Sequence, residues 1–197
     1  MISYIASCIV DMLIHNHAVD TEDAPVYQYG FEFLLSSLIT FAITITAGLL
    51  LKSFAAAMIY FFLFVTLRSI CGGYHAQTYF QCNLIFTIVT FSVLLMYKQI
   101  AVKMFVPMHY YMLLFSVIVA FAYVPVENEN KPLSQKQKKV SRVLGIAMML
   151  ILSLISCLLE IKFQSSYSIL IDATLFAVAI SMFVTEPMRG GEQKCAK

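Results

Sequence analysis

Charged residues are scarce in this chain. Asp, Glu, Lys and Arg make up 12% of its 197 residues, while hydrophobic residues make up 60%. A soluble domain carries about 25% charge, so the polar side chains here could not cover a water-soluble globule. The net charge of +2 gives no electrostatic footprint for a nucleic acid. We therefore predict one membrane-embedded domain over residues 1–197, with no nucleic acid as a partner.

Cysteine pairs at metal-binding spacing are missing as well. No Cys-x-x-Cys motif occurs, and the cysteines are scattered and odd in number. A disulfide framework or a structural zinc site needs closely spaced, paired cysteines. We expect neither kind of site, and no metal or other cofactor. The five cysteines are Cys8, Cys71, Cys82, Cys157 and Cys195.

Lys and Arg are absent from residues 1–30. A secretory signal peptide begins with basic residues, so this segment does not read as one. Over residues 1–19, apolar residues recur at helical spacing on one face, namely Ile2, Ile5, Ile9, Met12 and Leu13. Such a helix lies in the membrane interface instead of spanning the bilayer. We predict an amphipathic interfacial helix, followed by an acidic loop that ends near residue 30.

Several runs are apolar enough to cross a bilayer as helices, which takes about 20 residues each. They predict an all-α, polytopic membrane fold with six transmembrane helices. We expect the last helix to end at Glu186-Pro187, and residues 125–142 to form a basic loop between the fourth and fifth helices. The predicted spans are 33–51, 54–70, 79–97, 104–124, 143–161 and 167–184.

The basic residues indicate an orientation for these spans. Six spans put both termini on one side, and that side carries nine of the 13 Lys and Arg residues, against four on the other. Basic loops stay in the cytoplasm. We therefore expect a multi-pass protein of the cell membrane with both termini, the loop at 125–142 and the turn between the second and third spans on the cytoplasmic side.

This turn, residues 68–82, holds the densest set of reactive side chains. A cysteine nucleophile needs a base within about 3 Å. Along one straight helix His75 and Cys82 would lie about 10 Å apart, so the chain must bend, and Gly72-Gly73 is where it can. We expect His75 in the bend and Cys82 in the first turn of the next helix, capped by Thr78. The helix dipole favours a thiolate at that position.

Other assignments stay open for these side chains. A cysteine at the start of a span is commonly an apolar filler, and an interfacial histidine is commonly a hydrogen-bonded anchor. Cys71 is a rival nucleophile, and Arg68 can serve as a lipid anchor through its long side chain. A third catalytic residue is also open, with three candidates that could orient the histidine or donate to an oxyanion: Gln77, Asn83 and Glu186.

Asp172 lies inside the sixth predicted span. A central acidic residue costs about 2.5–3.5 kcal/mol on insertion, so it needs a partner or a role. We expect a structural pairing with Ser or Thr groups, or with Lys162 or Lys52. A role in product exit is the alternative.

At the turn the sequence resembles a known family. The spacing Arg-x4-Gly-x-His-Ala-x5-Cys, at Arg68, Gly73, His75, Ala76 and Cys82, is similar to that of accessory gene regulator protein B. That family is the membrane endopeptidase of Gram-positive peptide quorum sensing. The resemblance extends to the loop at 125–139, where family members carry a Pro, then Lys-Pro, then a basic run. With the chain size, the amphipathic start and the six spans, it covers nearly the whole chain.

The resemblance implies a specific chemistry. Cys82 would be the nucleophile, and His75 its general base, in cutting a small precursor peptide on its C-terminal side. The cysteine forms a thioester with the new carboxyl end. A cysteine or serine inside the peptide then attacks this thioester, which gives a cyclic thiolactone or lactone. Arg68, Gly73 and Gln77 would position the substrate or support the site.

The predicted partner is a precursor peptide with an amphipathic leader and an acidic tail. The leader would lie in the membrane interface, and the tail would meet Arg68 or the basic cluster that includes Lys138 and Lys139. Anionic lipid is the alternative ligand for that cluster. Each basic residue near an anionic membrane surface contributes about 1 kcal/mol of binding free energy. The sequence also leaves open whether the protein forms a homodimer.

Two other functions compete with the peptidase. One is a non-enzymatic peptide transporter or exporter that uses intramembrane polar residues such as Asp172. The sequence shows no two-halves repeat of the sort many transporters carry. The other is a membrane assembly factor that recruits a partner through the basic loop.

Overall fold

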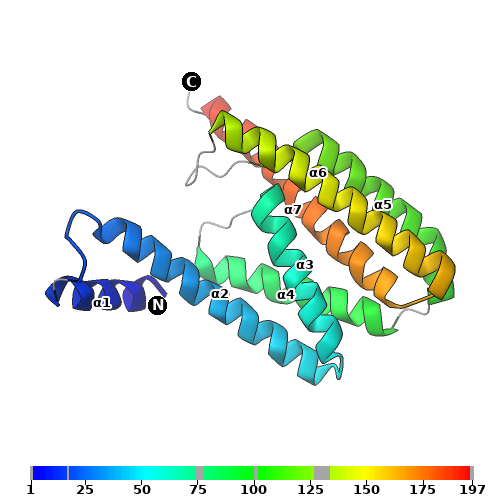
Figure 1. Cartoon of the computed structure of the whole chain (residues 1–197), viewed down its shortest axis with the longest axis horizontal. Helices are drawn as coiled ribbons and strands as arrows, with labels where there is room; N and C mark the ends of the chain where they lie inside the picture. Colours follow the sequence, from blue (N-terminus) through cyan, green and yellow to red (C-terminus); the bar gives the residue numbers. More distant parts are fainter. Residues whose placement is uncertain (1, 17, 74–77, 100–101, 127–133, 196–197) are drawn as a thin grey trace.

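A computed structural model describes residues 2–16, 18–73, 78–99, 102–126 and 134–195 (Figure 1). For residues 102–107 and 186–195 it describes the backbone alone. The described chain is helical throughout its regular structure, as predicted. Its helices are α1 (Ile2–His15), α2 (Ala24–Leu50), α3 (Phe54–Cys71), α4 (Tyr79–Gln99), α5 (Val102–Tyr123), α6 (Gln135–Leu158), the π-helical turn η1 (Leu159–Phe163) and α7 (Tyr167–Cys195).

Five of these helices are long and apolar enough to cross a bilayer: α2, α3, α4, α6 together with η1, and α7 up to Thr185. The predicted fourth span corresponds to α5, whose 22 residues reach about 33 Å at the rise of an α-helix. Its side chains are described only from Met108 onward. The chain is therefore a polytopic, all-α membrane protein, and the predicted fold class is confirmed.

The core of the molecule is α7. In its apolar part 61% of the residues are buried, against 17% to 33% in the other four spans. Figure 1 shows α7 between the α5–α6 pair and α3, and it packs against α3, α4, α5 and α6. Large side chains such as Leu170, Leu175 and Met182 are fully buried along it. The surrounding helices leave apolar side chains exposed, as suits surfaces that face lipid.

The amphipathic start of the chain forms α1, which packs on the beginning of α2 (Figure 1). Ala6 and Val10, one turn apart, form its buried contact. Ile5 and Met12 of the predicted apolar face stay 41% and 58% exposed. An apolar surface left open beside a span suits a helix that lies in the membrane interface.

Two predicted boundaries are wrong. The acidic loop ends at Asp23, not near residue 30, because α2 begins at Ala24 with Pro25 in its first turn. Proline fits there because its missing N–H has no helical partner to lose. At the other end α7 continues past Pro187 to Cys195. A proline removes one hydrogen bond from a helix interior, and neighbouring packing can preserve the helix across it.

Candidate active site

The predicted bend between α3 and α4 is present. α3 ends at Cys71, and Gly72 and Gly73 adopt φ angles of +79° and +145°, which L side chains rarely adopt. Space also requires glycine at both positions. A Cβ at Gly72 would lie 2.1 Å from the Val126 carbonyl oxygen, and one at Gly73 would lie 2.6 Å from Ser181 Oγ. The two glycines therefore turn the chain and bring its backbone against the end of α5 and against α7.

His75 and Gln77 lie outside the described residues, so their predicted roles stay predictions. The predicted place of Cys82 is confirmed. Thr78 precedes α4, and its Oγ1 accepts a hydrogen bond from the Gln81 N–H at 3.3 Å. The Cys82 N–H donates to the Thr78 carbonyl at 3.1 Å. Cys82 thus lies in the first turn of α4 and is half-buried, near the positive end of the helix dipole.

Arg68 reaches the Cys82 side chain across the bend. Its Nη2 lies 3.8 Å from Cys82 Sγ, and its guanidinium carbon lies 5.9 Å from the centre of the Phe64 ring. The guanidinium thus brings hydrogen-bond donors and a positive charge beside the sulfur. The sequence alone did not decide whether Arg68 is a lipid anchor or a residue of the site. The structure places it against the candidate nucleophile.

A cavity of about 40 Å³ opens beside these two residues. Its polar side chains come from three helices: Arg68 on α3, Cys82 on α4 and Ser181 on α7. The volume exceeds what one water molecule requires. The remaining lining side chains are apolar, namely Phe64, Ile85, Phe86, Val89 and Ala177. Cys82 therefore faces a small, mostly apolar space that α7 closes on one side.

The rival nucleophile, Cys71, is fully buried. Its sulfur lies 3.1 Å from the position that a Cβ on Gly145 would take, so α6 covers it closely. Its carbonyl accepts the Val126 N–H at 2.9 Å. Cys71 is a packing residue at the junction of α3, α6 and the end of α5, and Cys82 is the accessible thiol of the two.

The α2 side of the site holds a carboxylate that sequence reasoning missed. Tyr79 donates to Glu32 Oε2 at 2.9 Å, three residues before Cys82. One turn along, Ser36 donates to Asn83 Oδ1 at 3.2 Å. Asn83, a candidate third catalytic residue, is thus engaged with α2. The other two candidates, Gln77 and the side chain of Glu186, lie outside the part of the chain that the structure describes. The sequence feature that could have singled out Glu32 is its position directly before the first predicted span, 33–51.

The basic residues Lys138 and Lys139 lie in the first turns of α6. Ser134 and Gln137 form a capping box at its start, with hydrogen bonds of 2.9 and 3.3 Å. Lys138 is half-buried and Lys139 is exposed. About two turns further on, Gly145 packs beside Cys71. The cluster therefore lies at the same end of the bundle as the bend.

Asp172 has a serine partner, as predicted, and a histidine partner that was not. Ser156 donates to its Oδ1 at 2.6 Å, and His109 Nδ1 lies 2.5 Å from its Oδ2. The predicted lysine partners are wrong, since neither Lys52 nor Lys162 forms an ion pair with it. His109 also lies within a predicted span, and the rule that singled out Asp172 applies equally to it.

Comparison with known proteins agrees with the resemblance at the bend. The family described as accessory gene regulator B matches residues 6–185. An AgrB-like protein of Clostridium beijerinckii is 24% identical over 173 residues, 87% of this chain and 84% of that protein. An AgrB-like protein 2 of Clostridium perfringens is 26% identical over 147 residues, 71% of this chain and 67% of that protein. No solved structure matches the chain. Since the matched region covers most of its length, the chain belongs to the accessory gene regulator B family.

Proposed function

We propose that this chain is a membrane cysteine endopeptidase of peptide quorum sensing. It removes the C-terminal part of a precursor peptide and promotes cyclisation of the remainder into a thiolactone or lactone. The observation that carries the proposal is the contact between Arg68 and Cys82 at 3.8 Å, beside a small apolar cavity. Membership of the accessory gene regulator B family supports the quorum-sensing role.

In the first step Cys82 is the nucleophile and His75 the general base. The Cys82 thiolate attacks the scissile carbonyl carbon, the C–N bond breaks, and His75 returns its proton to the leaving amine. The new carboxyl end of the peptide remains on Cys82 as a thioester. Arg68 holds the thiolate before attack and offers positive charge to an acidic substrate tail.

In the second step a nucleophile inside the peptide releases the product. Its thiol or hydroxyl attacks the thioester carbonyl, the bond to Cys82 breaks, and the thiol of Cys82 is restored. Water would give a linear acid instead. The apolar lining around Cys82 supports ring closure, because a site that excludes water disfavours hydrolysis.

The orientation and the partners belong to the same proposal. A ribosomally made precursor is available on the cytoplasmic side, where the excess of Lys and Arg would hold the Cys82 end of the bundle. An amphipathic leader would lie in the interface beside α1. Lys138 and Lys139 at the start of α6 would attract the acidic tail, or anionic lipid.

The test is co-expression with a precursor peptide encoded beside the gene, followed by mass spectrometry. We expect cleaved peptide with the natural chain and a thioester on Cys82 when the internal nucleophile of the peptide is removed. Cys82→Ala and His75→Ala should leave the precursor intact. Cys8→Ala is the matched control, because Cys8 is an exposed thiol on α1, away from the bend.

The result also separates the peptidase from a transporter or exporter. An intact precursor with the natural chain, or full cleavage by Cys82→Ala, contradicts the peptidase. A transporter that relies on Asp172 would move peptide without cutting it, and would depend on Asp172 but not on Cys82.

A further inference from the structure

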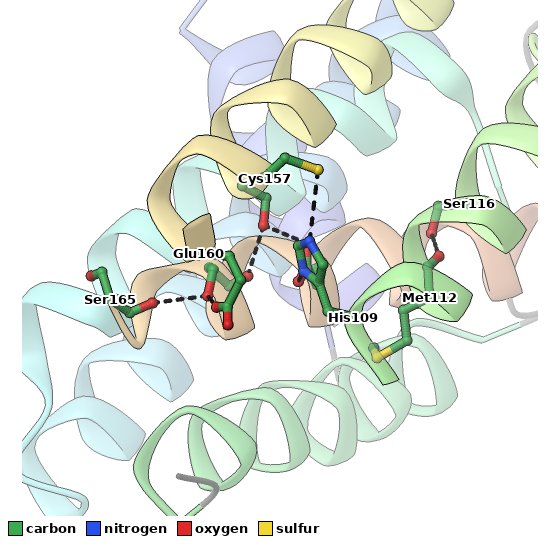
Figure 2. Close-up of polar contacts among 9 residues, drawn as sticks. His109, Met112, Ser116, Cys157, Glu160 and Ser165 are labelled. Atoms are coloured by element: carbon green, nitrogen blue, oxygen red, sulfur yellow. Dashed lines mark hydrogen bonds and ion pairs between the residues drawn. The ribbon is translucent and has the colours of Figure 1, made fainter. Parts of the chain in front are cut away.

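A second cysteine, histidine and aspartate form a row among α5, α6 and α7. Figure 2 labels the cysteine, Cys157, and the histidine, His109. Cys157 Sγ on α6 lies 3.6 Å from His109 Nε2 on α5. On the other side of the ring, His109 Nδ1 lies 2.5 Å from Asp172 Oδ2 on α7. A nucleophile within reach of a base, with the base held by a third group, is the arrangement that activates a cysteine.

The exposure of the three side chains differs along the row. His109 and Asp172 are fully buried, whereas Cys157 is half-buried. The sulfur is thus the accessible end of the row, and the base and the carboxylate lie behind it. A row that served only to bury Asp172 would not need a thiol at its open end, because His109 and Ser156 already occupy both carboxylate oxygens.

A network of hydrogen bonds holds the Asp172 carboxylate. Ser156 donates to Asp172 Oδ1 at 2.6 Å and lies 3.2 Å from the Ser168 carbonyl. Ser168 in turn donates to Glu160 Oε2 at 2.7 Å. Glu160 belongs to η1 and is 5% exposed. A π-helical turn of this kind is frequent at functional sites.

The partners of the two His109 ring nitrogens suit one tautomer. An Asp172 carboxylate accepts from Nδ1–H, which leaves Nε2 to accept the proton of the Cys157 thiol. Both ring nitrogens are therefore engaged along a line. Their groups do not converge on one point, and no set of three metal ligands occurs among the described residues. The row fits proton transfer from a thiol better than metal binding.

This row is distinct from the Cys82 site. α4 leads away from Cys82, His109 lies near the start of α5, Cys157 lies in the last turn of α6, and Asp172 lies near the start of α7. The opposite end of α5 returns to the bend, where Val126 bonds to Cys71. The row therefore lies toward the other end of the bundle.

The surface beside Cys157 is apolar. Leu154, one turn earlier on α6, is 62% exposed, and the adjacent Leu158 is 53% exposed. Ile161, in η1, is 71% exposed. A molecule that reaches the sulfur must therefore cross or lie in a hydrophobic surface, which selects an apolar reactant over a charged one.

We propose that Cys157, His109 and Asp172 form a second thiol site that accepts acyl groups from apolar thioesters. His109 Nε2 takes the proton from Cys157, and the thiolate attacks the thioester carbonyl carbon. The bond from carbon to the donor sulfur breaks, and the leaving thiolate takes the proton back from His109. One thioester replaces another, so the step needs neither water nor an oxidant. Asp172 is a positioning residue in this step.

A thioester is the fitting substrate class because exchange between two sulfurs is close to balanced and its leaving group is a weak base. A cyclic thiolactone peptide is one apolar thioester. Its assignment as the natural donor rests on the proposed function, but the reactivity of the site does not. The test therefore uses a synthetic donor and removes Cys82.

The experiment uses the full-length Cys82→Ala chain in detergent micelles and the octanoyl thioester of N-acetylcysteamine. Peptide mass spectrometry measures the rate of acylation at each remaining cysteine. We expect acylation of Cys157, and a rate at least about tenfold lower in His109→Gln because the general base is lost. Asp172→Asn should also slow the reaction and move its pH dependence toward that of Cys8, an exposed thiol on α1.

Two controls separate reactivity from folding. Ser153→Ala alters a serine one turn before Cys157 that bonds only to the Met149 carbonyl, and it should leave acylation unchanged. Cys71 is fully buried, so it should resist N-ethylmaleimide in every folded variant. Absence of acyl on Cys157 while Cys8 reacts overturns the proposal. Equal rates of Cys157 acylation in His109→Gln and its parent, with Cys71 still protected, also overturn the proposal.

Discussion

The guanidinium of Arg68 lies 3.8 Å from the sulfur of Cys82, although the two residues are 14 positions apart in the sequence and lie on different helices. The contact depends on the backbone turn at Gly72 and Gly73. It places positive charge beside the only described thiol that lines the cavity at the bend. Several measurements can test how far the site depends on this geometry.

Substitution of Arg68 should lower the reactivity of Cys82. A hydrogen bond to a charged group contributes about 1.5–3 kcal/mol, so Arg68→Gln should slow alkylation of Cys82 by iodoacetamide about tenfold or more. Arg68→Lys keeps the charge and should retain part of the rate. Peptide mass spectrometry at Cys82, with Cys8 as the internal reference, measures both. Equal rates in all three chains would show that the contact does not activate the thiol.

Gly73→Ala should distort the bend. The new Cβ would meet Ser181 Oγ at 2.6 Å, at a φ of +145°. We expect a lower melting temperature and loss of precursor cleavage. Adding Ser181→Ala removes the oxygen but not the backbone strain, so it should restore only part of the stability. Gly30→Ala is the matched control: no atom lies within 4 Å of its Cβ, and it should stabilise α2 by about 1 kcal/mol. A neutral Gly73→Ala would contradict the geometry.

Thr78→Ala should loosen the start of α4. Its Oγ1 caps the Gln81 N–H, and loss of a cap costs about 1 kcal/mol. We expect faster amide hydrogen exchange over residues 79–82 and a slower Cys82 reaction. Thr78→Ser keeps the cap and should behave like the natural chain. Unchanged exchange in Thr78→Ala would mean that packing, not the cap, holds this turn.

Ser156→Ala should destabilise the α6–α7 contact. It removes the donor to Asp172 Oδ1, and a buried acceptor without a partner costs about 1–3 kcal/mol. Unfolding in detergent micelles measures this loss. Ser153→Ala removes a serine that bonds only within its own helix and should cost less. Equal losses from the two variants would argue against a specific role for the Asp172 bond.

The orientation has its own test. A phosphatase that is active only outside the cytoplasm, fused after Gln99 at the end of α4, should be active. A fusion after residue 126, beyond α5, should be inactive. The reverse pattern would place the Cys82 end of the bundle outside the cell and remove access to a precursor made in the cytoplasm.

Local sequence features were enough to determine the helices, the bend and the position of Cys82. Apolar runs of bilayer length predict the spans, two adjacent glycines predict the turn, and Thr78 before Tyr79 predicts where α4 begins. Each of these depends on residues that are neighbours in the chain. The exceptions were also local: Pro25 allowed an earlier start of α2, and Pro187 did not end α7.

Only the tertiary structure decided which distant side chains meet. Arg68 with Cys82, Glu32 with Tyr79, and His109 with Asp172 come from different helices. Their contacts depend on helix rotation and packing around α7, and an apolar run does not specify which of its faces a neighbour will cover. The sequence by itself determined that this is a polytopic helical membrane protein with a turn that holds the candidate nucleophile, and packing determined which side chains lie beside Cys82 and Cys157.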